Sequence, residues 1–127
     1  MISLGRALAP SFAGRVVCFN GDLGAGKTTL IKGVVSELTQ NQVNAITSPT
    51  FNIMNTYANL YHFDCYRLEG PEEFLARGLD EPLYSGDLCL IEWPEKIQSL
   101  IPKDAIRIDI TTTDAGTREV IIHEPQL

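Results

Sequence analysis

Hydrophobic and polar positions near the start of the chain follow a helical, then a strand-like, then a second helical pattern. A short helix is expected over residues 3–9, with its end at Pro10. Residues 15–20 form a short apolar run rich in β-forming residues, which predicts a strand. Residues 28–38 carry apolar side chains on one helical stripe, which predicts a longer helix. The stripe consists of Leu30, Ile31, Val34, Val35 and Leu38.

The middle of the chain carries three strand-like segments and one helical segment. A short strand is expected over residues 43–47, followed by strands over 51–57 and 60–66. Only two residues separate the last two, so a hairpin or a sharp reversal is predicted. Pro71 suits the first position of a helix, and this helix is expected to end near Gly78.

The last third of the chain completes a predicted sheet. Residues 88–91 form a continuous apolar run, which is typical of a strand buried on both faces of a parallel sheet. Residues 105–111 alternate isoleucine with polar residues, and a turn separates them from a second strand over residues 118–124, as in an antiparallel hairpin. We therefore expect an α/β fold with a mixed, largely parallel sheet and a C-terminal hairpin, in one domain over residues 1–127.

The segment between the first strand and the long helix fits the pattern G-x-x-x-x-G-K-[ST], which is typical of a loop that binds nucleoside triphosphates. Backbone N–H groups and the helix N-terminus surround the phosphates in such a loop, so a three-layer fold like that of P-loop NTPases is predicted. Lys27 is expected to reach the β- and γ-phosphates, and Thr28 to offer its hydroxyl to Mg²⁺. The alternative is an ordinary glycine-rich turn with an exposed lysine. The loop consists of Gly21, Asp22, Leu23, Gly24, Ala25, Gly26, Lys27 and Thr28.

Two acids directly follow apolar runs, where ligands of an open parallel sheet bind. Glu92 follows residues 88–91 and is either a Mg²⁺ ligand, directly or through water, or a solvated acid at a strand end. Asp64 could position an attacking water, bind metal-bound water or pair with Arg67. Thr50 is either a switch residue that touches the γ-phosphate or magnesium, or a plain turn threonine.

Other residues with possible chemistry carry weaker signals. Cys18, Cys65 and Cys89 show no C-x-x-C spacing and are expected to be reduced core cysteines. His62 and His123 lack the spacing of metal ligands, so structural roles are favoured. Trp93 is predicted to lie either in the core or in a wall of the site.

Composition narrows the class of partner. The chain has 127 residues, with 10 Lys and Arg against 16 Asp and Glu, and a formal net charge of −6 at pH 7. A protein that grips nucleic acid alone normally has a basic face, whereas the basic residues here are scattered. Nucleic acid would therefore be reached through a protein partner. No apolar run approaches membrane-spanning length, so no membrane association is expected and the cytoplasm is the predicted location.

Four motifs resemble, in order and at similar spacing, the signatures of the bacterial TsaE (YjeE) ATPases. The loop motif alone is generic, but the ordered set is specific. The resemblance covers residues 4 to about 119, with Cys65 at a position where such proteins usually have leucine. The first motif, residues 21–29, is the glycine loop extended by Thr29. The other three are Ser48-Pro49-Thr50-Phe51, residues 62–68 and residues 91–95.

The resemblance implies a cytoplasmic ATPase required for threonylcarbamoylation of adenosine 37 in tRNAs that read codons beginning with A. Such proteins bind the TsaB–TsaD heterodimer and hydrolyse ATP to reset that complex, so tRNA is contacted only indirectly. By matching positions, residues 21–29 bind ATP, Thr28 and Glu92 bind Mg²⁺, and Lys27, Thr50 and Asp64 serve hydrolysis.

Two other functions share the predicted loop. A small kinase would need a substrate pocket and usually an arginine-bearing lid, for which Arg67 is the only nearby candidate in the sequence. A nucleotide-gated binding module with little turnover would share every binding residue with an ATPase. Since no arginine finger is evident beside the two acids, hydrolysis is expected to be slow alone and faster with the partner.

Overall fold

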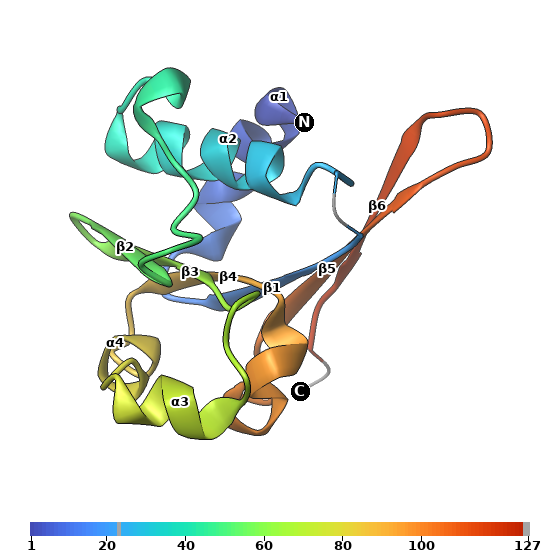
Figure 1. Ribbon diagram of the computed structural model, residues 1–127. Helices are drawn as coiled ribbons and strands as arrows, with labels where there is room; N and C mark the ends of the chain where they lie inside the picture. The colour runs from blue at the N-terminus through green and yellow to red at the C-terminus, as the bar shows by residue number, and fades with distance from the viewer. Residues whose placement is uncertain (23, 126–127) are drawn as a thin grey trace.

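Six strands form one mixed sheet in the computed structural model, which describes residues 1–22 and 24–125 (Figure 1). The strand order is β2-β3-β4-β1-β5-β6; the four central strands are parallel, and β2 and β6 are antiparallel to their neighbours. This confirms the predicted mixed, largely parallel sheet with its C-terminal hairpin. The strands are β1 (Val16–Asn20), β2 (Met54–Tyr57), β3 (Leu60–Asp64), β4 (Leu88–Glu92), β5 (Ile106–Thr112) and β6 (Arg118–His123).

Helices cover both faces of the sheet, which gives the three layers that the sequence predicts. Figure 1 shows α1 (Ile2–Leu8) and α2 (Lys27–Thr39) above the sheet. The opposite face is covered by α3 (Pro71–Ala76), α4 (Asp80–Leu83) and the 3₁₀ helix η3 (Pro94–Leu100). No helix in the described ranges is long and apolar enough to cross a membrane.

The apolar stripe of α2 packs against the sheet as its spacing predicts, except at its last member. Leu30, Ile31, Val34 and Val35 are fully buried, whereas Leu38 is 40% exposed because the helix runs past the edge of the core there. Successive residues of β4 bury their side chains on opposite faces, as the continuous apolar run at residues 88–91 predicts.

Two glycines bring α1 directly onto the backbone of α2. A Cβ atom on Gly5 would collide with the carbonyl oxygen of Leu30, and one on Gly33 would collide with the carbonyl oxygen of Ile2. Because neither glycine has a side chain, the backbones of the two helices are in direct contact. This contact supports α2 behind the glycine loop.

One predicted strand is absent, and two predicted strand boundaries are wrong. Residues 43–47 form no strand: a 3₁₀ turn, η2 (Val43–Ala45), occupies the segment, which buries Ile46 in the core but pairs with no described strand. The strand expected from residue 51 begins at Met54, because the backbone turns at Ile53, whose φ is 69°. The strand expected to residue 66 ends at Asp64.

The predicted helices lie closer to their expected positions than these strands do, although α4 and η3 were not predicted. The first helix ends at Leu8 and a 3₁₀ turn, η1 (Ala9–Phe12), contains Pro10. The helix that begins at Pro71 ends at Ala76, slightly earlier than expected. The short helices α4 and η3 were not predicted, because four-residue and 3₁₀ segments carry no readable helical period.

The three cysteines are buried and free, as expected. Burial raises the pKa of Cys18, Cys65 and Cys89 from near 9 to about 12. These thiols are therefore core side chains that stay protonated at neutral pH.

Candidate phosphate and magnesium site

The glycine loop connects the end of β1 to the start of α2, in the predicted order of strand, loop and helix. Gly24 and Gly26 have φ values of 81° and 106°, which residues other than glycine rarely adopt. Gly26 caps α2, and no side chain caps the first turn of this helix. Its backbone N–H groups and the positive end of the helix dipole are thus suited to an anion. Leu23, a predicted loop residue, lies outside the described residues.

Lys27 is a buried cation without a hydrogen-bond acceptor among the described residues. Its side chain is 6% exposed, and Nζ lies 3.5 Å from the centre of the Trp93 ring. Burial lowers the pKa of Lys27, while the carboxylates of Glu92, Glu95 and Asp64 act in the opposite sense. A buried ammonium group without an acceptor is suited to bind an anionic ligand such as phosphate.

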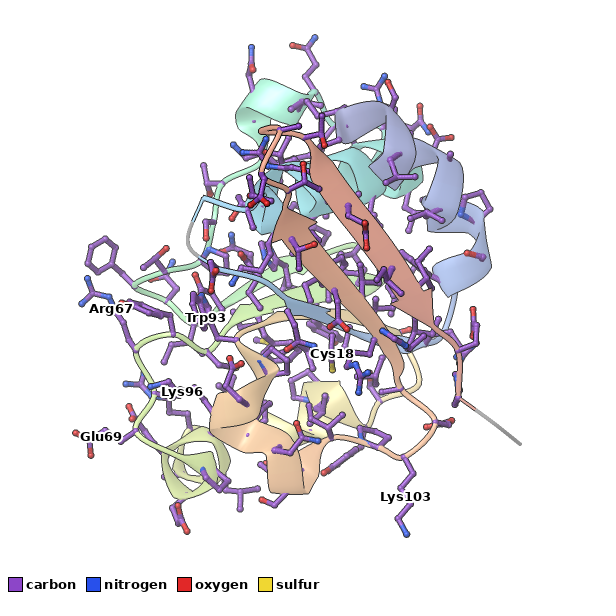
Figure 2. All side chains as sticks on the ribbon, turned by 90° about the vertical axis from the view of Figure 1, so that its right-hand side faces the viewer. Cys18, Arg67, Glu69, Trp93, Lys96 and Lys103 are labelled. Atoms are coloured by element: carbon purple, nitrogen blue, oxygen red, sulfur yellow. The ribbon has the colours of Figure 1, made fainter. Side chains whose placement is uncertain are left out.

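Trp93 therefore forms a wall of the site rather than part of the core alone. It follows Glu92 directly, and its backbone lies in the left-handed region with a φ of 58°. Such a conformation is strained for a bulky residue. The Tyr66 ring packs on the Trp93 ring at 4.9 Å between centres. Figure 2 shows Trp93 on the same side of the molecule as Arg67.

Glu92 is buried at the end of β4, with both carboxylate oxygens engaged. Thr28 Oγ1 donates a hydrogen bond of 2.9 Å to Glu92 Oε1, and His62 Nε2 lies 2.8 Å from Glu92 Oε2. Glu92 is 3% exposed, which excludes the alternative of a solvated acid at a strand end. The two residues predicted as magnesium ligands, Thr28 and Glu92, are thus in direct contact.

His62 has the structural role that the sequence favours, and its place makes that role specific. It lies on β3, is 1% exposed, and orients the Glu92 carboxylate through their contact. The signal for this in the sequence is the two-residue spacing of His62 and Asp64, since alternate residues of a strand share one face. His123, by contrast, lies on the edge strand β6 and contacts Asp109 on β5.

Asp64 lies beside Glu92, because the two residues are paired in register at the ends of β3 and β4. Asp64 Oδ2 accepts hydrogen bonds of 3.3 Å from the hydroxyls of Ser48 and Thr50, and Oδ1 accepts one of 3.0 Å from the Tyr66 N–H. The predicted switch residue Thr50 therefore contacts the predicted water-positioning residue Asp64.

Arg67 does not form the ion pair with Asp64 that the sequence allowed. Its guanidinium group lies over the ring of Phe51, 4.3 Å from the ring centre, and Phe51 is 79% exposed. Asp64 thus keeps its carboxylate for hydroxyl and N–H donors.

The oxygen ligands gathered here fit a magnesium ion that arrives with a nucleotide. No group of three His, Cys, Asp or Glu side chains in the described ranges could hold a metal ion by itself. Mg²⁺ commonly binds through one or two carboxylates together with water and substrate phosphates. Glu92 and Thr28 supply one carboxylate and one hydroxyl, and the glycine loop lies next to them.

One arginine that contacts the loop was not predicted from the sequence. Arg118, the first residue of β6, donates from Nε to the Ala25 carbonyl at 2.7 Å and from Nη2 to the Gly24 carbonyl at 2.9 Å. It lies 93 positions from Ala25, and no local motif marks it. The sequence offered Arg67 alone as a nearby arginine, whereas the arginine that contacts the loop is Arg118.

Comparison of the whole chain with known proteins points to one family. The family model described as "Threonylcarbamoyl adenosine biosynthesis protein TsaE" matches residues 1–120. The chain is 39% identical over 113 residues to the tRNA threonylcarbamoyladenosine biosynthesis protein TsaE of Rickettsia prowazekii, covering 86% of the chain and 77% of that protein. It is 39% identical over 119 residues to the protein of the same name from Bacillus subtilis, covering 89% and 73%. The crystal structure of Bacillus subtilis YdiB has a TM-score of 0.72 and 30% identity, covering 99% of the chain and 82% of that structure.

Proposed function

The chain belongs to the TsaE family of threonylcarbamoyl adenosine biosynthesis proteins, and on this premise we propose that it is a magnesium-dependent ATPase. It acts in the cytoplasm on the TsaB–TsaD heterodimer and thereby serves threonylcarbamoylation of adenosine 37 in tRNA. Because its net charge is −6, it reaches tRNA only through that complex.

The observation that carries the proposal is the buried Lys27 ammonium group, which has no acceptor among the described residues and lies at the N-terminus of α2. A triphosphate supplies the missing acceptors, and the glycine loop from Gly21 to Thr28, followed by Thr29, surrounds it. Lys27 holds the β- and γ-phosphates, and the Trp93 ring lies against its ammonium group.

Thr28 and Glu92 hold the magnesium ion, which neutralises charge on the triphosphate when bound. Their mutual hydrogen bond orients the hydroxyl and the carboxylate together, and His62 fixes the second carboxylate oxygen. The protein thereby presents both ligands in one arrangement.

Asp64 and Thr50 serve hydrolysis rather than binding. Asp64 accepts hydrogen bonds from neighbouring hydroxyls, so its carboxylate is suited to accept one from a water beside the γ-phosphate. Thr50 is held by that same carboxylate and belongs to a segment that ends in the strained turn at Ile53. A partner that orders this segment would complete the arrangement.

Hydrolysis by the isolated protein is slow on this account. Arg67 lies over Phe51 and Arg118 is bound to the loop carbonyls, so neither guanidinium group contacts Asp64 or Glu92. An arginine supplied by a partner accelerates hydrolysis by roughly 10³- to 10⁵-fold in related chemistry. The TsaB–TsaD complex either supplies such a group or orders the Thr50 segment.

The test is steady-state phosphate release from ATP during a titration with the TsaB–TsaD complex. The rate should rise and saturate with partner concentration. Asp64→Asn should strongly lower this rise, whereas Asp104→Asn, an exposed residue in the turn before β5, should not. An unchanged rate despite demonstrated complex formation would reject activation by the partner. Tight ATP binding without turnover at any partner concentration would instead indicate a nucleotide-gated binding module.

A further inference from the structure

The C-terminal hairpin of β5 and β6 reaches back to the glycine loop. Figure 1 shows it extending past the start of α2, on the side of the sheet that α1 and α2 cover. The turn between its strands is closed by a 2.6 Å hydrogen bond between the hydroxyls of Thr113 and Thr117 and by a bond from the Thr113 N–H to the Thr117 carbonyl. Arg118 follows this turn directly and pairs with Thr112 on β5. Its backbone is therefore well anchored.

The guanidinium group of Arg118 binds two successive carbonyl groups of the loop. Nε donates to Ala25 and Nη2 donates to Gly24, at 2.7 and 2.9 Å. A planar guanidinium group presents its donors in a rigid fork, so both carbonyls are held in one orientation. The approach is close: a Cβ atom on Gly26 would lie 3.4 Å from both Cδ and Nε of Arg118.

Holding these carbonyls also fixes the N–H groups of the next residues. In a trans peptide the carbonyl and the following N–H point in opposite directions, and the described residues contain no cis peptide. The Gly24 carbonyl thus sets the N–H of Ala25, which donates to the Asp22 carbonyl at 3.0 Å inside the loop. The Ala25 carbonyl fixes the direction of the Gly26 N–H. This N–H, at the start of α2, therefore points away from the guanidinium group.

We propose that Arg118 is a positioning residue that holds the glycine loop in its phosphate-binding form, so that the C-terminal hairpin is part of the nucleotide site. The inference rests on the proposed function, since it assumes that the loop binds phosphates. Arg118 acts through the loop backbone and not on the γ-phosphate. Its loss therefore weakens the binding of every ligand that has a β-phosphate, so the affinities for ADP and ATP fall alike.

The experiment compares wild type with Arg118→Ala and Arg118→Lys, and with Arg107→Ala as a control that removes a cation from the neighbouring strand. Calorimetry gives the Kd of ATP–Mg²⁺ and of ADP–Mg²⁺, and phosphate release at saturating ATP and saturating TsaB–TsaD gives the maximal rate. Arg118→Ala should raise both Kd values by a similar factor, about tenfold, because only a fraction of the loops is then competent to bind. The maximal rate should stay near that of wild type.

Arg118→Lys keeps the charge but lacks the fork, so its Kd values should lie between those of wild type and Arg118→Ala, and it serves as the test variant if the alanine variant is unstable. Arg107→Ala should bind like wild type. An unchanged Kd for ADP in both Arg118 variants, or a loss confined to ATP and to the maximal rate, would overturn the inference. If wild type binds neither nucleotide, the proposed function falls together with the inference, whereas equal binding by wild type and Arg118→Ala overturns the inference alone.

Discussion

Thr28 and Glu92 lie 64 positions apart in the chain, and a hydrogen bond of 2.9 Å joins the Thr28 hydroxyl to the Glu92 carboxylate. The bond links the first turn of α2 to the end of β4. It brings together two oxygen groups that magnesium prefers, beside a loop suited to phosphates. The proposed metal ligands are therefore held together by the protein itself.

Glu92 and Asp64 should differ in what they support, although they lie side by side on neighbouring strands. Glu92→Gln removes a charge from the proposed metal site, so the dependence of ATP affinity on Mg²⁺ should weaken. Asp64→Asn should leave ATP affinity near wild type and lower the partner-stimulated rate, because only water positioning is lost. Calorimetry with and without Mg²⁺, together with phosphate release, separates the two effects. Full partner-stimulated turnover by Asp64→Asn would contradict the role proposed for Asp64.

His62 should matter for stability as well as for the site. His62→Ala leaves one oxygen of the buried Glu92 carboxylate without its donor, which should lower the free energy of unfolding by about 1–3 kcal/mol. His123→Ala is the matched control, since His123 also contacts a carboxylate but is far more exposed. Urea denaturation measures both variants, and equal stability of His62→Ala and wild type would show that the His62 contact is unimportant.

Gly33 should tolerate no side chain, because α1 packs on its backbone. Gly33→Ala forces the two helices apart and should destabilise the protein by about 1–3 kcal/mol, as overpacking in a core does. Gly70→Ala is the control, since its Cβ would approach only the flexible end of Glu72 and its φ of 174° is open to any residue. Thermal denaturation of the two variants tests this, and similar melting temperatures would contradict the close packing of α1 on α2.

The buried thiols should make the protein sensitive to alkaline pH. Burial raises the pKa of each cysteine from near 9 to about 12, so the native state keeps protons that the unfolded state releases. Stability is therefore fully present below about pH 9 and declines as the pH rises toward 12, by at most about 1.4 kcal/mol per pH unit for each thiol. Urea midpoints at about pH 7 and about pH 10 measure this decline, which Cys18→Ala should lessen. A flat profile over this range would show that the thiols do not contribute.

The sequence predicts the centre of this molecule better than its periphery. The strand, loop and helix around Lys27 were predictable because a local motif and local periodicity coincide there. Glu92 and Asp64 were found because acids at the ends of parallel strands meet at one edge of the sheet. The length of a strand such as 51–57 was misjudged, because the turn at Ile53 depends on contacts with Pro49 and Asp64 that no local pattern encodes.

Arg118 illustrates the remaining limit of sequence reasoning. Its contact with the loop depends on the placement of an antiparallel hairpin at the end of the sheet, beside β1. The hairpin itself was predicted, but the direction in which Arg118, the first residue of β6, points was not. The contact between Lys27 and the Trp93 ring was foreseen only in part, since the strained backbone of Trp93 sets the position of the ring.

The most direct test of the account is a calorimetric titration of ATP–Mg²⁺ into wild type and Lys27→Ala. Lys27 is the buried cation whose missing acceptor the triphosphate would supply, and Lys32, which lies farther along α2, provides a control variant, Lys32→Ala. Wild type and Lys32→Ala should bind ATP–Mg²⁺ alike, and Lys27→Ala should bind far more weakly. Binding by Lys27→Ala as tight as that of wild type would contradict the assignment of the glycine loop as the phosphate site.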